Sequence, residues 1–330
     1  MVNEGTDNRA DGTDTDLFRW LDSLKFSRFH VSLVLMTGLS IFFAGYCTQI
    51  EAFVLPSLLK DWGLPPVKAG ALVSWGFLGI MLGALFFGPI ADRAGRKKTL
   101  LVALALCSLA TGLSCFAPGF TTFCLLRFCT GLGIGGVFPL SITLVAEVAP
   151  SGIRARLLTV AVGGFTLGWV AAALVSMALI PAFGWRIVLA AGALPLLFLP
   201  LLWLYLPESV RFLCGRMDQI KLNNEVNRIG RITDTPPPAL PERASAMLSR
   251  PGSGRLSNLF RSGLARMTIL LSLTYLFSTL ALYGISSWLP SLLVKAGFSL
   301  AKSFSYSMVQ AIGSCVGGCS PRLPPRCLWA

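Results

Sequence analysis

Seven long stretches of apolar residues, each almost free of charge, constrain this chain more than any other feature of its sequence. A helix needs about 20 mostly apolar residues to cross the hydrocarbon core of a bilayer. Lipid offers no hydrogen-bond partners to an open backbone, so stretches of this kind must be helices. The predicted spans are 31–55, 71–90, 99–117, 122–146, 157–180, 187–206 and 267–293. An eighth apolar stretch, 304–318, is too short to span comfortably.

Composition supports this fold class. Hydrophobic residues make up 54% of the chain and charged residues 13%, whereas a soluble domain carries about 25% charge. The apolar surface of such a chain exceeds what one water-soluble core can bury. The sequence therefore predicts an all-α polytopic membrane protein.

The basic residues are distributed unevenly between the two sides of the predicted membrane. The net charge is +13. With the N-terminus in the cytoplasm, twenty Lys and Arg residues fall in inner segments and five in outer loops. The positive-inside rule therefore predicts a cytoplasmic N-terminus. We expect a multi-pass protein of the plasma membrane, which in a bacterium is the inner membrane. Because topology accounts for the charge, and anionic lipid heads would attract it, nucleic acid is not an expected partner.

The order of segments predicts a transporter of two six-helix halves, the second incomplete. Residues 1–28 are predicted to be a polar cytoplasmic tail without a signal peptide, and 29–207 a six-helix N-terminal half. Residues 208–266 are polar, basic and proline-containing, which predicts a cytoplasmic linker. Residues 267–318 would hold the seventh span and part of the eighth.

Two further expectations concern the ends of these segments. A short amphipathic helix is expected in the linker near 217–232. Residues 319–330 contain three prolines and break the apolar pattern, which suggests a shifted reading frame or a premature stop. We therefore expect a chain that is C-terminally truncated relative to a complete transporter.

The loop after the second predicted span carries a dense motif. It reads Gly88-Pro89-Ile90-Ala91-Asp92-Arg93-Ala94-Gly95-Arg96-Lys97-Lys98. Gly88 would let two helices meet closely, and Gly95 would permit a tight turn. Asp92 lies at the membrane edge, where an unpaired charge is costly, so it should find a cation or a helix N-terminus.

This motif resembles the signature loop of the major facilitator superfamily. The resemblance implies a gating loop whose salt bridges across the two halves lock the outward-open state, and its members would be Gly88, Asp92, Arg93, Gly95, Arg96 and Lys97. Glu147, at the inner end of the fourth span, resembles the acidic partner of Arg96. The alternative is that the basic residues only follow the positive-inside rule.

Four other stretches narrow the resemblance, namely 127–136, 184–186, 206–213 and 287–293. Together they are similar to the aromatic acid:proton symporter family, over roughly residues 26–318. The resemblance implies proton-coupled alternating-access transport of a small organic acid, with the proton gradient as energy source and no cofactor. Sugar and polyol porters share several of these elements, but the glutamines they usually carry in spans five and seven are absent here. A sugar porter and a non-transporting membrane fragment remain alternatives, and no catalytic constellation points to an enzyme.

Two charges fall inside predicted spans. Arg127 is costly within a membrane, and it could hold a substrate carboxylate with two parallel hydrogen bonds. Its alternative is a structural or snorkelling Arg near the outer interface. Glu51 is the only acid in a predicted span, with Tyr46 and Gln49 nearby, and it could carry a proton. Its alternative is an interfacial Glu in contact with water.

The first span departs from the family pattern. The aromatic acid symporters carry Asp-Gly-aromatic-or-Leu-Asp there, whereas this chain has Ala44-Gly45-Tyr46-Cys47. Positions 44, 47 and 51 share one helix face, so our hypothesis is that Glu51 replaces the missing acids. The expected partners are a small organic acid, protons and the lipid bilayer, and the oligomeric state stays open.

Overall fold

The computed structural model describes residues 17, 19–215, 219–237 and 264–319, and within these ranges the regular structure is entirely helical. Seven of the helical segments are long and apolar enough to cross a membrane, at Arg28–Trp62, Val67–Ala94, Arg96–Phe116, Phe120–Val148, Arg154–Phe183, Trp185–Tyr205 and Ala265–Lys295. They coincide with the seven predicted spans, which confirms the fold class. Each begins two to four residues before the predicted start, and five of them continue past the predicted end, whereas Arg96–Phe116 and Trp185–Tyr205 end one residue before it.

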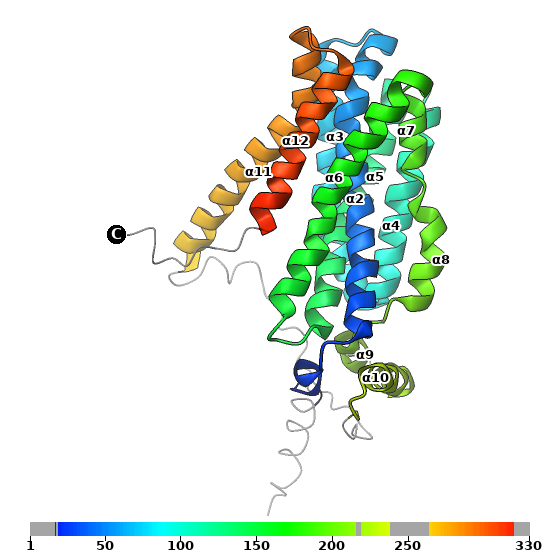
Figure 1. Ribbon diagram of the computed structural model, residues 1–330, viewed down its shortest axis with the longest axis vertical. Helices are drawn as coiled ribbons and strands as arrows, with labels where there is room; N and C mark the ends of the chain where they lie inside the picture. The colour runs from blue at the N-terminus through cyan, green and yellow to red at the C-terminus, as the bar shows by residue number, and fades with distance from the viewer. Residues whose placement is uncertain (1–16, 18, 216–218, 238–263, 320–330) are drawn as a thin grey trace, which may run out of the picture.

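The first five membrane helices are α2 (Arg28–Trp62), α3 (Pro66–Ala94), α4 (Arg96–Leu113, prolonged by the 3₁₀ turn Ser114–Phe116), α5 (Phe120–Val148) and α6 (Arg154–Phe183). The sixth span consists of α7 (Trp185–Ala191) and α8 (Pro195–Tyr205). They stand side by side along the long axis of the molecule (Figure 1). We call the end where α2 begins and α5 ends the near end, and the opposite end the far end.

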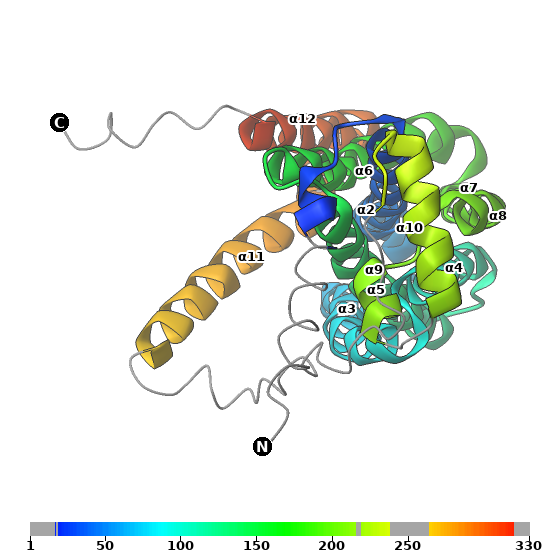
Figure 2. The same cartoon turned by 90° about the horizontal axis from the view of Figure 1, so that it is seen from below.

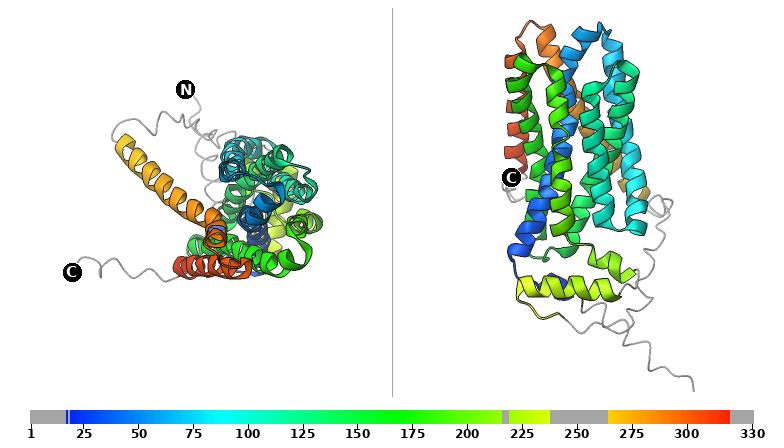
Figure 3. Two further views of the ribbon diagram at one scale, coloured as in Figure 1. Left: turned by 90° about the horizontal axis from the view of Figure 1, so that it is seen from above. Right: turned by 90° about the vertical axis from the view of Figure 1, so that its right-hand side faces the viewer.

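Two short helices follow the bundle, α9 (Val210–Gly215) and α10 (Gln219–Thr233). Helix α10 lies across the near end of the bundle, perpendicular to the long helices (Figure 3). It matches the amphipathic helix expected near 217–232, of which residues 217 and 218 lie outside the described ranges. Its apolar side chains Leu222, Val226 and Ile229 are buried toward the bundle.

The last two helices are α11 (Leu264–Lys295) and α12 (Leu300–Cys319). Helix α12 packs along α6, whereas α11 meets the bundle at the far end and leans away from it toward the near end (Figures 1 and 2). Helix α12 begins four residues before the predicted stretch 304–318. It is not among the seven candidate spans of the described chain.

The bundle is held by direct contacts between helix backbones. A Cβ at Gly79 of α3 would lie 2.2 Å from the carbonyl oxygen of Phe128 in α5, and one at Gly131 would lie 2.1 Å from that of Gly76. Gly168 of α6 approaches α2 in the same way. Small residues at helix interfaces are the usual means by which membrane helices pack, because lipid provides no hydrophobic drive between them.

The sixth span is not the single helix that was predicted over 187–206. The backbone N–H groups of residues 192–194 bond to carbonyls three residues back, which forms a tighter turn between α7 and α8. Pro195 then removes the donor that a continuous helix would need. Gly192 allows this turn to press on α4, since a Cβ there would lie 2.3 Å from Cγ2 of Thr111.

Candidate functional site

A small cavity inside the bundle brings together the two charges that were predicted within spans. Its volume is about 20 Å³, and α2, α3, α5 and α11 surround it. Its polar lining consists of Glu51, Arg127, Thr48, Thr130 and Ser287. A cavity of this size holds about one water molecule, so a ligand needs the surrounding helices to separate before it can enter.

Arg127 is buried within the bundle, with 1% of the residue exposed. Its Nη1 donates a hydrogen bond of 3.2 Å to the carbonyl oxygen of Cys47. The guanidinium lies over the ring of Phe123, 5.4 Å from its centroid. Its Nε and Nη2 have no hydrogen-bond partner among the described residues. A snorkelling Arg would place these donors at the surface, so that alternative does not fit the geometry.

Glu51 faces the same cavity from α2. Its Oε1 is buried and has no hydrogen-bond partner in the described part of the chain, and its Oε2 would lie 3.3 Å from a Cβ at Gly76. Glu51 and Arg127 interact electrostatically but do not form a contact ion pair. A buried acid and base that leave donors and acceptors open are costly to keep, which is the pattern expected of groups that bind something else.

Tyr46 and Gln49 do not line this cavity. The Tyr46 hydroxyl donates a hydrogen bond of 2.9 Å to the carbonyl oxygen of Val188 in α7. The Gln49 amide donates one of 3.2 Å to the carbonyl oxygen of Ser286 in α11. Both side chains therefore join helices in this conformation, and their place in a substrate or proton pathway stays a prediction. Of the face that positions 44, 47 and 51 were expected to share, Cys47 and Glu51 line the cavity and Ala44 does not.

Three polar cavity residues were missed from the sequence, Thr48, Thr130 and Ser287. Thr48 precedes Glu51 by three residues and Thr130 follows Arg127 by three, so helical spacing could have found both. Ser287 comes from α11, and no local pattern places it beside α2 and α5. The Thr130 hydroxyl also lies 3.2 Å from that of Thr111 in α4.

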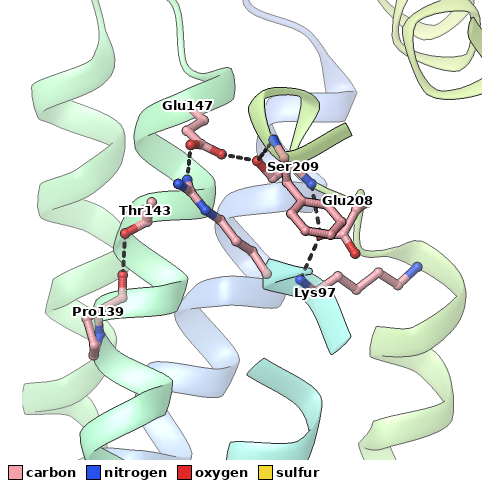
Figure 4. A network of polar contacts seen from close by, with 8 residues as sticks. Lys97, Pro139, Thr143, Glu147, Glu208 and Ser209 are labelled. Atoms are coloured by element: carbon pink, nitrogen blue, oxygen red, sulfur yellow. Dashed lines mark hydrogen bonds and ion pairs between the residues drawn. The ribbon is translucent and has the colours of Figure 1, made fainter. Parts of the chain in front are cut away.

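At the near end, a polar network joins α4, α5 and the segment between α8 and α9 (Figure 4). Arg96 pairs with Oε1 of Glu147, as the family resemblance implied. The other carboxylate oxygen of Glu147 accepts a hydrogen bond of 2.5 Å from the Ser209 hydroxyl. Glu208 accepts one of 3.0 Å from the backbone N–H of Lys97. A carboxylate at a helix N-terminus is favourable for the helix dipole, so Glu208 caps α4.

The members of the predicted gating loop differ in their surroundings. Gly95 adopts a φ of 103° between α3 and α4, as the tight turn required, and a Cβ there would lie 2.7 Å from Oε2 of Glu208. The prediction that Gly88 brings two helices together is wrong for the described chain, because a Cβ there would meet nothing within 4 Å. Gly88 lies on a side of α3 that no described helix covers. Arg93 is exposed.

Asp92 was expected to find a cation or a helix N-terminus. It is exposed, and no described residue forms an ion pair with it. The charge of Asp92 still acts electrostatically on Arg96, four residues on. The gating role of the loop stays a prediction.

A larger cavity of about 310 Å³ lies under α10 at the near end, lined by Lys97, Lys98, Trp203, Glu208 and Glu225 among others. The Lys97 ammonium lies over the Trp203 ring, 5.6 Å from its centroid. This cavity lies outside the centre of the bundle, between the ends of α4 and α8 and the cover formed by α10. The described residues contain no cluster of His, Cys, Asp and Glu that could hold a metal ion.

A bundle of membrane-length helices around a cavity that holds a buried acid and a buried base is the architecture of an integral membrane transport protein. The chain belongs to the Major Facilitator Superfamily, whose family model matches residues 37–330.

Curated relatives agree with this assignment. The chain is 36% identical to the niacin transporter NiaP of Acinetobacter baylyi over 92% of this chain and 68% of the relative. It is 34% identical to a gallate transporter of Pseudomonas putida over 92% of this chain and 67% of the relative. It is 32% identical to a benzoate transport protein of Acinetobacter baylyi over 90% of this chain and 66% of the relative. The chain thus spans about two thirds of the length of these relatives.

Solved structures show the same fold. The chain is similar to the xylose transporter XylE from E. coli in a partially occluded inward open conformation, with a TM-score of 0.67, 20% identity, and coverage of 88% of this chain and 69% of that one. It is also similar to a bacterial homologue of the human lysosomal transporter Spinster, with a TM-score of 0.64, 20% identity, and coverage of 91% and 65%. At this identity the likeness concerns the fold alone.

Proposed function

We propose that the protein takes part in proton-coupled secondary transport of a small aromatic monocarboxylate, with Arg127 as the anion-binding group and Glu51 as the proton carrier. One observation carries this proposal. The two side chains face the same cavity from α2 and α5, and each keeps polar atoms without a described partner. So placed, Glu51 can take up or release a proton, and Arg127 can balance its charge either with Glu51 or with a bound anion.

The charges in the cavity suggest how substrate and proton are coupled. While Glu51 is ionised, it balances the charge of Arg127, and an incoming carboxylate would compete with it for the guanidinium. A proton on Glu51 removes that competition, because Arg127 then needs another anion to balance its buried charge. The free Nε and Nη2 donors suit a carboxylate, which Arg can bind with two hydrogen bonds. One proton would therefore enter with each substrate anion.

The aromatic part of the substrate is supported by the relatives and by the walls of the cavity. The three relatives are named as transporters of niacin, gallate and benzoate, each an aromatic ring with one carboxylate. Phe77, Ile80 and Ile134 supply apolar walls around the two charges. The cavity is too small for such a ring in this conformation, so binding requires the helices to move apart.

The near-end network would hold the bundle closed at that end between such movements. Arg96, Glu147 and Ser209 join three segments there, and breaking these contacts would release the segment before α9 from the near ends of α4 and α5. The positive-inside distribution favours the cytoplasm for the near end, and a bacterial inner membrane suits the source of the relatives. The likeness to XylE concerns the fold alone, so it does not support transport of a sugar.

Uptake of radiolabelled benzoate, nicotinate and xylose into cells that express the full chain tests this proposal. Benzoate or nicotinate should accumulate when an inward proton gradient is imposed, and xylose should not. Glu51→Gln should abolish the response to the gradient, and Arg127→Gln should reduce uptake of the acid at least tenfold. Arg156→Gln makes the same change at an exposed Arg in the first turn of α6, and it should leave uptake unchanged.

Three results would contradict the proposal. Gradient-driven uptake that survives Glu51→Gln would remove Glu51 from the proton pathway. Accumulation of xylose in place of the acids would favour the sugar porter. Absence of all uptake from a chain that reaches the membrane folded would favour a membrane protein that does not transport.

A further inference from the structure

A second cavity of about 170 Å³ lies between α2 and α11 toward the far end. Pro56 and Leu59 line it from α2, and Trp288, Ser291 and Lys295 line it from α11. Its walls are mostly apolar, with one hydroxyl and one ammonium. The cavity therefore suits a ligand that has a hydrophobic body and a polar end.

Ser291 is the feature that most needs an explanation. The residue is 6% exposed, and its hydroxyl has no hydrogen-bond partner in the described chain. Hydroxyls elsewhere in these two helices bond to the carbonyl four residues back, as Thr48 of α2 does at 2.7 Å and Thr274 of α11 at 2.9 Å. A buried polar group without a partner is costly, so a group that enters the cavity is expected to supply one.

The three polar or aromatic lining residues of α11 lie on one face of the helix. Ser291 follows Trp288 by three residues, and Lys295 follows Ser291 by four, which is the spacing of neighbours on a helix surface. The Trp288 ring points toward the bundle, since its Cζ2 would lie 3.8 Å from a Cβ at Gly70. Lys295 ends α11, and its side chain is exposed. The cavity thus offers an aromatic wall, a buried hydroxyl and a cation in that order toward the far end.

This cavity is stacked on the central one. Ser287 of α11 lines the central cavity, and Ser291 lines the second cavity one turn further along the same helix. On α2, Pro56 follows Glu51 by five residues, a rise of about 7.5 Å. The two cavities therefore follow each other along the same pair of helices, from the far end toward Glu51 and Arg127.

We infer that the second cavity is a separate binding site for an aromatic monocarboxylate, occupied before the anion reaches Arg127. The ring would lie against Trp288, and the carboxylate would accept a hydrogen bond from Ser291 and pair with Lys295. The inference rests on the proposed substrate class, and it adds a site and three residues to it. A lipid chain would fill the apolar walls but would leave the Ser291 hydroxyl unpartnered, so it is the less suitable occupant.

Equilibrium binding of radiolabelled benzoate to the purified full chain in lipid nanodiscs tests this inference. Wild type should bind two equivalents of benzoate. Ser291→Ala combined with Lys295→Gln should bind one, and so should Arg127→Gln. The single variant Lys295→Arg keeps both the charge and the Ser291 hydroxyl, so it should bind two equivalents like wild type. Benzyl alcohol, which has the ring without the carboxylate, should not displace the equivalent that Ser291 and Lys295 hold.

The alternative results are distinguishable. If wild type binds one equivalent and Arg127→Gln abolishes it, the binding site in the second cavity is overturned and the proposed function is left intact. No bound benzoate in wild type would overturn both. Displacement by benzyl alcohol or by added lipid as readily as by benzoate would show an apolar cleft and overturn the inference. Thermal unfolding of each variant in the same nanodiscs identifies any variant that has lost its fold. If the double variant of Ser291 and Lys295 does not fold, Trp288→Leu takes its place and should also lose one equivalent.

Discussion

Arg96, the first residue of α4, pairs with Glu147 in the last turn of α5, so one ion pair joins two helix ends at the near end of the bundle. The two side chains are 17% and 11% exposed, which limits screening by water. Glu147 also accepts a hydrogen bond from Ser209. The same carboxylate therefore ties α4, α5 and the start of α9 together.

Arg96→Met should lower the stability of the six-helix bundle, because Glu147 would keep its buried charge and lose its cation. A hydrogen-bonded charged contact of this kind contributes about 2 kcal/mol. The loss can be measured by SDS titration of the purified protein in mild detergent. Lys98→Met removes an exposed cation two residues away and is the matched control. Equal losses in the two variants would show that the pair does not hold the helix ends together.

Gly131→Ala should destabilise the contact between α3 and α5. The added Cβ would lie 2.1 Å from the carbonyl oxygen of Gly76, so the two backbones must separate. Overpacking in a tight interior costs about 1–3 kcal/mol. Gly163→Ala, in α6, is the control, because its Cβ would meet nothing within 4 Å. Thermal unfolding should give a lower midpoint for Gly131→Ala than for Gly163→Ala, and equal midpoints would contradict the close approach.

The membrane helices could be predicted from the sequence because apolar length is a local property of each stretch. The tight turn at Gly95 was equally local, since its neighbours Arg96 and Lys97 already mark the end of a span. The side of α2 on which each residue lies could also have been predicted from helix geometry. At about 100° per residue, Gln49 lies about 160° from Glu51 around the helix, and Tyr46 about 140°. Nearness in sequence was therefore the wrong guide to which of these residues share a cavity.

Other features depend on partners that no local pattern names. The open surroundings of Gly88 follow from which helix covers that side of α3. The contribution of Ser287 depends on where α11 meets α2, a helix that ends more than 220 residues before Ser287 in the sequence. The break in the sixth span depends on the contact of Gly192 with Thr111 as well as on Pro195.

The attachment of α10 to the near end should weaken as pH rises. Burial raises the pKa of the Glu225 carboxyl above its ordinary value, while Arg228 and Lys97 act in the opposite direction. The docked state therefore favours the protonated form more than the detached state does. Its stability is greatest below the ordinary pKa of Glu and declines as pH rises through the raised pKa.

Hydrogen exchange of the α10 amides, corrected for the intrinsic rate at each pH, measures this effect. Protection should decrease across that pH window in wild type and stay constant in Glu225→Gln, which cannot ionise. Asn223→Asp places a charge at an exposed position of the same helix and should leave the pH dependence of wild type unchanged. A pH dependence that persists in Glu225→Gln would assign it to another group.

The near end should face the cytoplasm. Fusions of alkaline phosphatase, which is active only outside the cytoplasm, can be placed after Gly119 at the far end and after Leu158 in the first turns of α6. The first fusion should be active and the second inactive, because Arg93, Arg96, Arg154 and Arg156 all lie at the near end and resist translocation. Replacing Arg154 and Arg156 by Gln in the second fusion should raise its activity, since it weakens the charge asymmetry that holds this loop inside. High activity after Leu158 together with low activity after Gly119 would reverse the orientation, and would place the second cavity on the cytoplasmic side of Glu51 and Arg127.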